Sequence, residues 1–569
     1  MNLPAGNVGR ALGVIVSGAA GDALGWPQEI RSGIVGGQRA RDDLNPEPRY
    51  REWTRNGGNR YLAQYRDPIS AGEYSDDTQL LCACARSCLE GKDWLRRLTE
   101  IELPAWRIYQ RGGGRAVLAA ASGWANGRPP WVGGDSSRLQ EQVTRYRQAG
   151  ANGVAMRIAP HVLYAFRQHS SYLDRVLLDG LTTHGHPRAL VGALVYASAL
   201  ATAYSCPATL EYGALVAGAR EGIVAPTEAM ELLPKKWADM SDLRIFEQSW
   251  AQANHETTEL LNVVDHSLSQ GAMSNAENTL RSLGCIDSRV SGAGTVTAAG
   301  AIYLASRSAA RPMSGLLTAA FAPKADTDTL ASMTGGLLGA IHGSEWLGAL
   351  LRVQDREYLG KLASALAEHG ERFSLSRPTR TPETLRHELD VSIDAGFAAA
   401  SSGEFPDGRR YSVTGLSQLE SRKLVTRVRL KLDDGQTVSV DRIGGGLSEV
   451  ARNKRSSELA GSARSRQAKI GRLSVGTGRI KECAEFYSRA LGDIIMVQDG
   501  RLQITDWFEL FEIERGAGAY LSELQITLVT SNLDKISKVL AGDTLGDGPT
   551  RRLRLRDPDG RIVYLEQED

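Results

Sequence analysis

Apolar residues recur every three or four positions through most of residues 3–375, which is the spacing of packed α-helices. Residues 77–90, 187–204 and 329–341 are three such runs, and the first of them stops at Gly91. Alternation with a period of two, which marks half-buried strands, is hard to find in this part of the chain. The pattern therefore predicts one large all-α bundle.

The pattern changes after Ser376. Residues 377–382 contain two prolines and favour a turn that breaks the helical run. Further along, apolar and polar residues alternate over 425–432, Asp434-Gly435 supplies a turn, and alternation returns over 437–440. These features predict a β-hairpin.

The last hundred residues mix short strands with two helices. In chain order, we expect a strand at 470–475, a helix at 480–491, strands at 494–497, 502–513 and 524–529, a helix at 533–540, and strands at 552–555 and 561–565. This order repeats one β-α-β-β unit and predicts an α+β domain of paired βαβββ units.

The sequence therefore predicts a multidomain protein with three regions. Residues 1–375 form the all-α domain, residues 376–466 a linker with the hairpin, and residues 467–569 the α+β domain. Between positions 451 and 472, seven basic residues face one acidic residue, Glu458. That segment reads as a solvated linker, with a phosphate-binding strip as the alternative.

Composition narrows the class of protein. The chain has 569 residues with 67 Lys+Arg against 66 Asp+Glu, so no overall charge would draw it to nucleic acid or to an anionic membrane. Hydrophobic residues make up 42% of the chain, which excludes a largely disordered protein. The longest apolar stretch, 191–204, is shorter than the ~18 residues that a bilayer span requires.

Six cysteines are too few for a secreted disulfide scaffold and favour a reducing, cytoplasmic location. Cys82, Cys84 and Cys88 lie in one helical run without the Cys-x-x-Cys spacing of a zinc or redox site. We expect them to pack as small apolar side chains. The first 25 residues imitate a signal peptide, but cleavage there would remove a helix that leads directly into Gly21-Asp22, so we expect this helix to be retained.

Carboxylates gather at two predicted helix N-termini that are 250 residues apart, Asp76-Asp77 and Asp326-Thr327-Asp328. Either pair alone is explained by helix capping and by the helix dipole. If the two pairs converge, however, they need a cation, because like charges raise one another's pKa. Oxygen ligands of this kind suit Mg²⁺ or Mn²⁺, and two ions would suit four carboxylates. Asp22 is expected to buttress this site or to cap a helix.

Six short motifs follow one another along the helical region. They are Gly21-Asp22-Ala23-Leu24-Gly25 with Glu29, Ser75-Asp76-Asp77-Thr78, Arg111-Gly112-Gly113-Gly114, Asn152-Gly153-x-x-Met156-Arg157, Thr183-His184-x-His186-Pro187 and Asp326-Thr327-Asp328-Thr329. With this set and order, residues 9–350 resemble the ADP-ribosylglycohydrolase family. The resemblance implies an all-α bundle with two Mg²⁺ or Mn²⁺ ions that hydrolyses the glycosidic bond at C1″ of ADP-ribose.

The resemblance also implies roles for individual residues. The implied metal ligands are Ser75, Asp76, Asp77, Asp326, Asp328 and Thr329. The implied catalytic residues are Glu29, Asp77 and Asp328. The implied substrate-binding residues are Gly112, Gly113, Gly114, Asn152, Gly153, Met156 and His184. For His184 and His186, ordering of their own loop is an equally good interpretation.

Two positions depart from the family pattern. Lys324-Ala325 stands where many relatives have Gly-Gly, and Ala151 stands where a glycine usually precedes Asn152. These changes are expected to crowd the ligand side of the pocket and to place a cation near it. They affect the expected substrate preference more than catalysis, because every expected oxygen ligand is present.

The C-terminal region resembles the glyoxalase/bleomycin-resistance fold, also called vicinal oxygen chelate. The resemblance is carried by residues 485–492 and 557–561, which lead to Glu566. Arg472 stands where the first metal-binding His of that fold is expected, although Gln525 and Glu566 match other ligand positions. We therefore interpret this domain as a module for binding a partner or for self-association.

The leading hypothesis is a hydrolase that removes ADP-ribose from a modified protein side chain, such as arginine, or from nucleic acid. A different class is a non-catalytic ADP-ribose reader whose appended domain recruits a partner. A third hypothesis is a defence protein that neutralises an ADP-ribosylating toxin. No membrane partner is expected.

Overall fold

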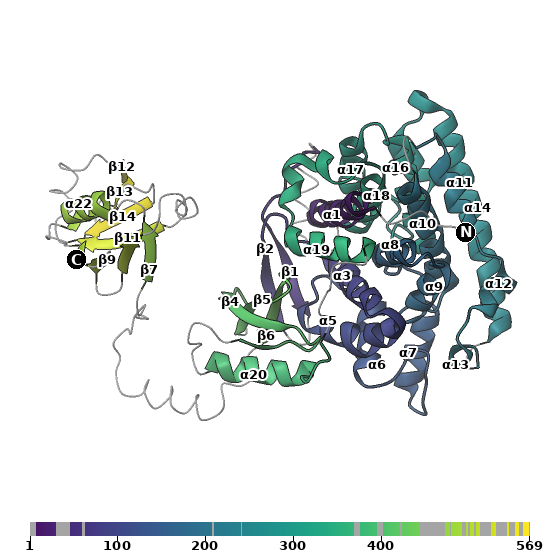
Figure 1. Ribbon diagram of the computed structural model, residues 1–569, viewed down its shortest axis with the longest axis horizontal. Helices are drawn as coiled ribbons and strands as arrows, with labels where there is room; N and C mark the ends of the chain where they lie inside the picture. Colours follow the sequence, from purple (N-terminus) through teal and green to yellow (C-terminus); the bar gives the residue numbers. More distant parts are fainter. Residues whose placement is uncertain are drawn as a thin grey trace. The chain divides into compact units, whose positions relative to one another are not determined.

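The computed structural model separates into two units, Met1–Glu449 and Val450–Asp569 (Figure 1). The structure describes residues 7–29, 46–59, 63–206, 210–239, 242–368, 376–394, 402–421 and 424–443, and, in the second unit, the strands and the helix given below. The basic segment 451–472 and the predicted helix 533–540 lie outside the described residues. No described helix has both the length and the hydropathy that crossing a membrane requires.

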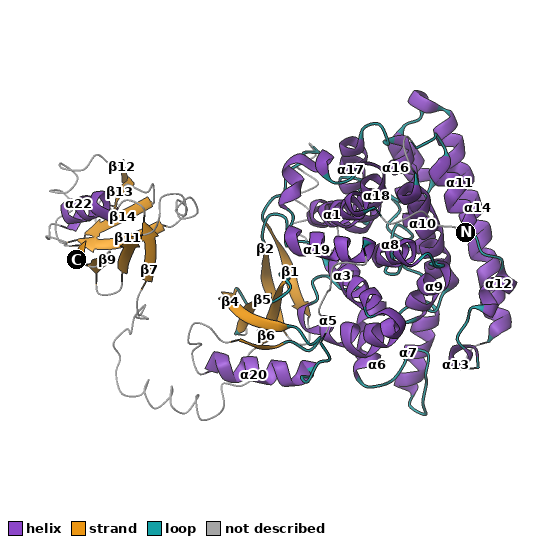
Figure 2. Ribbon diagram, in the orientation of Figure 1, coloured by secondary structure: helices purple, strands orange, loops and turns teal. Residues whose placement is uncertain are grey.

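The first unit is predominantly helical, as Figure 2 shows. Its helices are α1 (Val8–Gly25), α3 (Asp76–Leu89), α4 (Trp94–Arg97), α5 (Leu103–Tyr109), α6 (Arg115–Ala125), α7 (Ser137–Arg147), α8 (Ala159–Gln168), α9 (Leu173–Leu181), α10 (Pro187–Ser205), α11 (Ala214–Glu221), α12 (Pro226–Glu231), α13 (Lys235–Ala238), α14 (Leu243–Ser269), α15 (Ala276–Ser282), α16 (Gly294–Arg307), α17 (Pro312–Ala320), α18 (Thr327–His342), α19 (Arg356–Ala367) and α20 (Pro382–Asp394). The three predicted runs correspond to α3, α10 and α18, which confirms them.

Helices α1 and α18 pack antiparallel at the centre of the bundle with their backbones in contact. A Cβ atom on Gly13 would lie 2.1 Å from the carbonyl oxygen of Gly339, and one on Gly21 would lie 2.2 Å from that of Ala331. A Cβ on Gly25 would lie 2.2 Å from the carbonyl oxygen of Thr327. Glycine is therefore required along this seam, and the seam fixes where α18 begins relative to the end of α1.

One β-element inside the helical region was not expected. Strands β1 (Trp53–Asn59) and β2 (Ala63–Ile69) form an antiparallel hairpin, so the prediction of a purely α region is wrong at this point. Most of its described residues are exposed or only partly buried. The apolar alternation that would mark a strand is correspondingly weak.

The region expected as a linker contains a four-stranded antiparallel sheet with the order β3-β4-β5-β6. Its strands are β3 (Ser402–Glu404), β4 (Arg410–Leu419), β5 (Val425–Leu432) and β6 (Thr437–Ile443). The predicted hairpin is β5–β6, and Gly435 in its turn has a φ of 105°. Leu430 and Phe405 of this region share a buried core with Trp106 of α5, so the sheet is an integral part of the first unit.

A buried ionic cluster joins this sheet to the helices. Glu102 pairs with both Arg86 (2.6 Å) and Arg97 (3.0 Å), and all three side chains are almost fully buried. Arg97 also donates to the carbonyl oxygen of Asp407, and Arg86 donates to Gln436 beside strand β6. The helical part therefore supplies the ion pairs, and the sheet region supplies neutral acceptors that satisfy further N–H groups of the two buried arginines.

The second unit contains two four-stranded sheets, with orders β7-β10-β9-β8 and β11-β14-β13-β12. Its elements are β7 (Leu473–Thr477), α22 (Ile480–Leu491), β8 (Val497–Gln498), β9 (Arg501–Thr505), β10 (Phe508–Glu512), β11 (Gln525–Thr530), β12 (Asp543–Leu545), β13 (Arg552–Arg556) and β14 (Ile562–Gln567). The predicted strand 502–513 is two strands, β9 and β10. The pairing of two complete βαβββ units and the glyoxalase-like fold stay predictions.

Candidate active site

Two helix N-termini bring four carboxylates together. Asp76 and Asp77 occupy the first turn of α3, while Asp326 is the N-cap of α18 and Asp328 lies in its first turn. All four side chains are buried and line one cavity of about 880 Å³. The two acidic clusters that are 250 residues apart in the sequence therefore meet, as the sequence predicted.

Asp22 buttresses the start of α3, as expected. Its carboxylate accepts hydrogen bonds from the backbone N–H of Ser75 (3.1 Å) and of Thr78 (3.0 Å), and from the Thr78 hydroxyl (2.6 Å). The hydroxyl of Ser75 in turn accepts a hydrogen bond from the backbone N–H of Asp77. Ser75, predicted as a metal ligand, thus caps α3 and is not among the residues that line the cavity in the described part of the chain.

The carboxylates repel one another electrostatically. Burial, together with the charges of Asp22 and Glu29, raises the pKa of Asp76 to about 8. Burial and the charges of Asp22 and Asp76 raise the pKa of Asp77 well above its ordinary value. Burial and the charge of Glu29 do the same for the pKa of Asp328. A bound cation would remove this repulsion.

The residues present fit a hard divalent cation. Carboxylate oxygens of Glu29, Asp326 and Asp328 lie within 4.8 Å of one another. Oδ1 of Asp77 is buried and has no hydrogen-bond partner in the described part of the chain. A Cβ on Gly112 would lie 2.9 Å from Oδ1 of Asp76, so this glycine keeps space open beside the carboxylate. Mg²⁺ and Mn²⁺ prefer oxygen ligands of this kind.

The predicted substrate-binding residues surround the same cavity. Gly112, Gly113, Gly114, Asn152, Gly153, Met156 and His184 all line it. The glycines precede α6, whose first residues also line the cavity, so the N-terminus of this helix lies at its wall. Free N–H groups at a helix N-terminus favour anions. The N–H of Gly113 itself is already bonded to Oε1 of Gln110.

Asn152 orients a carboxylate. Its Nδ2 donates to Oδ2 of Asp326 (3.1 Å) and to the hydroxyl of Thr297 (3.1 Å). The side chain was predicted to bind substrate, and the structure uses its amide to hold one of the acidic residues in place. Thr329, a predicted ligand, donates its backbone N–H to Oδ1 of Asp328 (2.9 Å).

The two histidines of the Thr-His-x-His motif have different roles. His184 is buried at the cavity wall, and its Nδ1 lies 2.8 Å from the hydroxyl of Thr183. Burial and the charge of Arg157 lower the pKa of His184 to about 3, so this imidazole is neutral. His186 instead caps α10 by accepting from the N–H of Arg188. Of the two, His184 is the one that faces the cavity.

One positively charged side chain at the site, that of Arg55, is not indicated by the sequence. Arg55 on β1 lines the cavity, and its guanidinium lies 5.1 Å from the centre of the Trp26 ring. Oδ2 of Asp67 on β2 forms an ion pair with Nε of Arg55 at 2.7 Å. Asp67 also pairs with Arg111 and Arg427. These arginines outweigh the effect of burial and lower the pKa of Asp67. The polar hairpin gave no periodic signal that could have revealed Arg55.

The positions that depart from the family pattern, Lys324-Ala325 and Ala151, differ in whether they line the cavity. Lys324 is exposed, and neither Lys324 nor Ala325 belongs to the described lining of the cavity. The expected crowding by these two residues is therefore wrong. Lys324 has a φ of 63°, a left-handed conformation in which glycine is unstrained. Ala151 does line the cavity.

The comparison with protein families agrees with these motifs. The model of a family described as ADP-ribosylglycohydrolase matches residues 4–374. A solved structure titled "ADP-ribosylglycohydrolase-related protein complex" is similar at 23% identity with a TM-score of 0.36, over 63% of this chain and 97% of that one. No curated protein matches the chain.

Proposed function

The chain belongs to the ADP-ribosylglycohydrolase family, whose members hydrolyse glycosidic bonds, and we propose that it releases ADP-ribose from a modified acceptor. The acceptor is a protein side chain such as arginine, or a nucleic acid. The observation that supports this most is the meeting of Asp76 and Asp77 with Asp326 and Asp328 in one cavity beside Glu29. The carboxylates line one part of the cavity, and the turn at residues 112–114 before α6, which suits a diphosphate, lines another.

We propose that two Mg²⁺ or Mn²⁺ ions complete the site. Asp76, Asp77, Asp326, Asp328 and Thr329 would hold them, because these residues carry oxygen ligands and line the cavity. When bound, the ions supply Lewis acidity at the ribose hydroxyls and at the attacking water. They also relieve the repulsion that raises the pKa of the buried carboxylates.

The protein residues divide the remaining tasks. The diphosphate lies against the N-terminus of α6 and the turn at residues 112–114, with the guanidinium of Arg55 nearby. His184 is neutral and offers a ring nitrogen at the cavity wall. These contacts hold the ribose so that its C1″ faces the carboxylates, which lowers the entropic part of the barrier.

Hydrolysis breaks the bond between C1″ and the acceptor atom and forms a bond from C1″ to the oxygen of water. One water proton goes to the acceptor atom, and the hydroxyl stays on the ribose. Glu29, which is half-buried at the cavity, is placed to take and return a proton, and Asp77 and Asp328 stabilise positive charge that develops on the sugar.

The experiment is an acceptor panel. Protein with Mg²⁺ or Mn²⁺ should release free ADP-ribose from an ADP-ribosylated arginine, serine or nucleic acid, and EDTA should abolish the release. Asp326→Asn should abolish it too, whereas Asp93→Asn, at an exposed position on the surface, should not. Failure to release ADP-ribose from every acceptor, with metal bound, would contradict the proposal.

The reader hypothesis makes a different prediction. A non-catalytic module would bind ADP-ribose without releasing it from any acceptor. Hydrolysis is favoured because each of the predicted carboxylates is present and lies at the cavity. If the protein bound ADP-ribose but released it from no acceptor in the same panel, the reader hypothesis would be favoured over hydrolysis.

For the second unit we propose recognition of the acceptor-bearing partner, or self-association. The test compares the full chain with a form ending after residue 449, where the first unit ends. Equal activity and equal preference across the acceptor panel would leave the second unit no targeting role. The same comparison by light scattering would show whether it assembles the chain.

A further inference from the structure

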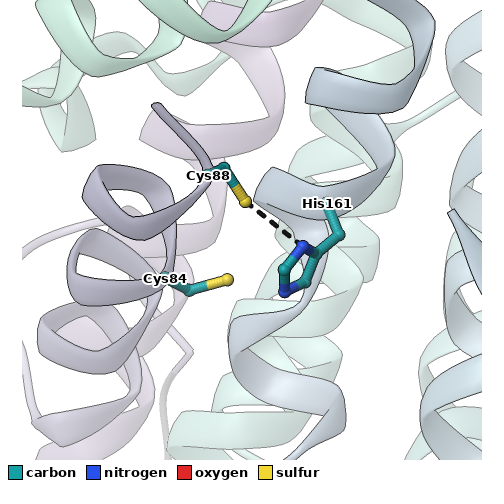
Figure 3. Close-up of side chains that lie close together, drawn as sticks. All are labelled: Cys84, Cys88 and His161. Atoms are coloured by element: carbon teal, nitrogen blue, oxygen red, sulfur yellow. Dashed lines mark hydrogen bonds between the residues drawn. The ribbon is translucent and has the colours of Figure 1, made fainter. Parts of the chain in front are cut away.

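A second group of potential metal ligands lies between α3 and α8, further along α3 than the carboxylates at its N-terminus. Cys84 and Cys88 are one helical turn apart, so their sulfurs lie on the same face of the helix. His161 of α8 faces them, and Figure 3 shows the two sulfurs and the imidazole pointing toward one another. Sγ of Cys88 lies 3.2 Å from Nδ1 of His161, and one ligand atom from each residue lies within 4.8 Å of the others. All three side chains are completely buried.

The imidazole of His161 is held in the orientation of a metal ligand. Its Nε2 lies 3.0 Å from Oδ2 of Asp179, and Asp179 is itself paired with Arg157 at 2.6 Å. The carboxylate thus engages Nε2 and leaves Nδ1 directed at the sulfurs. A carboxylate that fixes the far nitrogen of an imidazole is the usual second layer around a metal-bound histidine.

Arg175 places a positive charge beside the group, and no carboxylate of the described residues forms an ion pair with it. Its guanidinium lies over the rings of Trp94 (4.6 Å) and Tyr164 (4.9 Å), and its Nε donates a hydrogen bond to Nδ1 of His161 (3.4 Å), which a bound metal ion would replace. Its Nη2 is buried and has no hydrogen-bond partner among the described residues. An anionic cluster at Cys84 and Cys88 would neutralise this charge.

We propose that Cys84, Cys88 and His161 form a buried site for one soft, thiophilic metal ion, of the class to which Cu⁺ and Zn²⁺ belong. Thiolate and imidazole select such ions, whereas the carboxylate site selects hard ones. At 1.5 Å per residue, Cys84 lies about 10 Å further along α3 than Asp77, so the two sites are separate.

Charge and ligand number favour Cu⁺ over Zn²⁺. Asp179 and Arg157 neutralise each other, so two thiolates and Arg175 leave one negative charge, which a monovalent ion balances. Structural Zn²⁺ sites almost always have four ligands, and the group found among the described residues has three. Binding releases the thiol protons to solvent.

The test measures metal retention and not hydrolysis. The full chain is incubated anaerobically with reductant and either Cu⁺ or Zn²⁺, passed over a desalting column, and analysed for metal by mass spectrometry. We expect one equivalent of soft ion to be retained. Cys84→Ala and Cys88→Ala should each lose it, while Cys82→Ala should keep it, because Cys82 is equally buried on the same helix but lies near Arg86 instead of His161.

Two further measurements separate this site from the carboxylates. Asp326→Asn should retain the soft ion undiminished, and Co²⁺ added to the wild type should give thiolate charge-transfer absorption that Cys84→Ala lacks. Circular dichroism of each variant checks that it is folded. Retention of neither ion by the folded wild type, or equal retention by the folded Cys84→Ala variant, would overturn the proposal. Either result is independent of the outcome of the acceptor panel.

Discussion

Replacing Gly25 by alanine tests how closely the active site depends on the seam between α1 and α18. A Cβ at this position would lie 2.2 Å from the carbonyl oxygen of Thr327 and 2.9 Å from the Cα of Asp328. Ordinary contacts begin at 3.4 Å, so the helices would have to separate by about 1.2 Å (3.4 − 2.2) at this point. This is where α18 begins and presents its carboxylates.

Gly25→Ala is expected to lower both the stability of the protein and its catalytic rate. Overpacking a dense core lowers the free energy of unfolding by about 1–3 kcal/mol. A displacement of roughly 1 Å at a catalytic group can lower the rate about 10²-fold. Gly25→Ala should therefore lower both the thermal midpoint and kcat for ADP-ribose release, with metal present at saturating concentration.

Gly9→Ala is the matched control on the same helix. Gly9 is exposed, and the atom nearest to a Cβ at this position, Oδ1 of Asn7, would lie 3.4 Å away. Helix propensity alone should then raise the free energy of unfolding by roughly 0.5–1 kcal/mol and leave kcat unchanged. A Gly25→Ala variant with wild-type kcat and thermal midpoint would refute the reasoning about the seam.

Three other predictions concern stability. Glu102→Gln should lower the free energy of unfolding by about 3–5 kcal/mol in urea titrations, because it leaves buried Arg86 without a carboxylate partner among the described residues and leaves Arg97 with Glu90 alone. Glu100→Gln, at an exposed pair with Arg96, should change it by less than about 1 kcal/mol. Lys324→Gly should raise the thermal midpoint by relieving a left-handed conformation that disfavours side chains, and an unchanged or lower midpoint would contradict this. The pKa of Asp67 is lowered by its arginines, so its contribution to stability is complete above pH 3.8 and is lost as the pH falls through its lower folded value. The difference in urea midpoint between wild type and Asp67→Asn should therefore shrink below pH 3.8, and a constant difference would argue against the charge pairing.

Much of the bundle could be predicted because its signals are local. The helix at 77–90 follows from apolar spacing within fourteen residues, and the turn of the β5–β6 hairpin follows from Asp434-Gly435. The acidic residues of the site were found because each pair starts a helix and the motifs occur in family order. Their meeting depends on the glycine seam, which the motif Gly21-Asp22-Ala23-Leu24-Gly25 includes.

Contacts between distant segments could not be predicted. Nothing around His161 in the sequence indicates that it faces Cys84 and Cys88, so the cysteines were interpreted as core residues alone, and their burial is only part of what the structure shows. Arg55 lies on a polar hairpin, and only the pairing with Asp67 reveals its position. The cost of burying such charges is decided by partners far away in the chain.

The sheet β3–β6 changes what counts as the smallest self-sufficient piece of this protein. The family match ends at residue 374, yet the ion-paired interior continues to β6, which ends at Ile443, 69 positions later (443 − 374). A polypeptide cut at the edge of the family match would open Trp106 to water and strip Arg97 of a carbonyl partner on Asp407. The boundary of the family match therefore differs from the boundary of the folded unit. A shortened form made for expression should extend to the end of the folded unit.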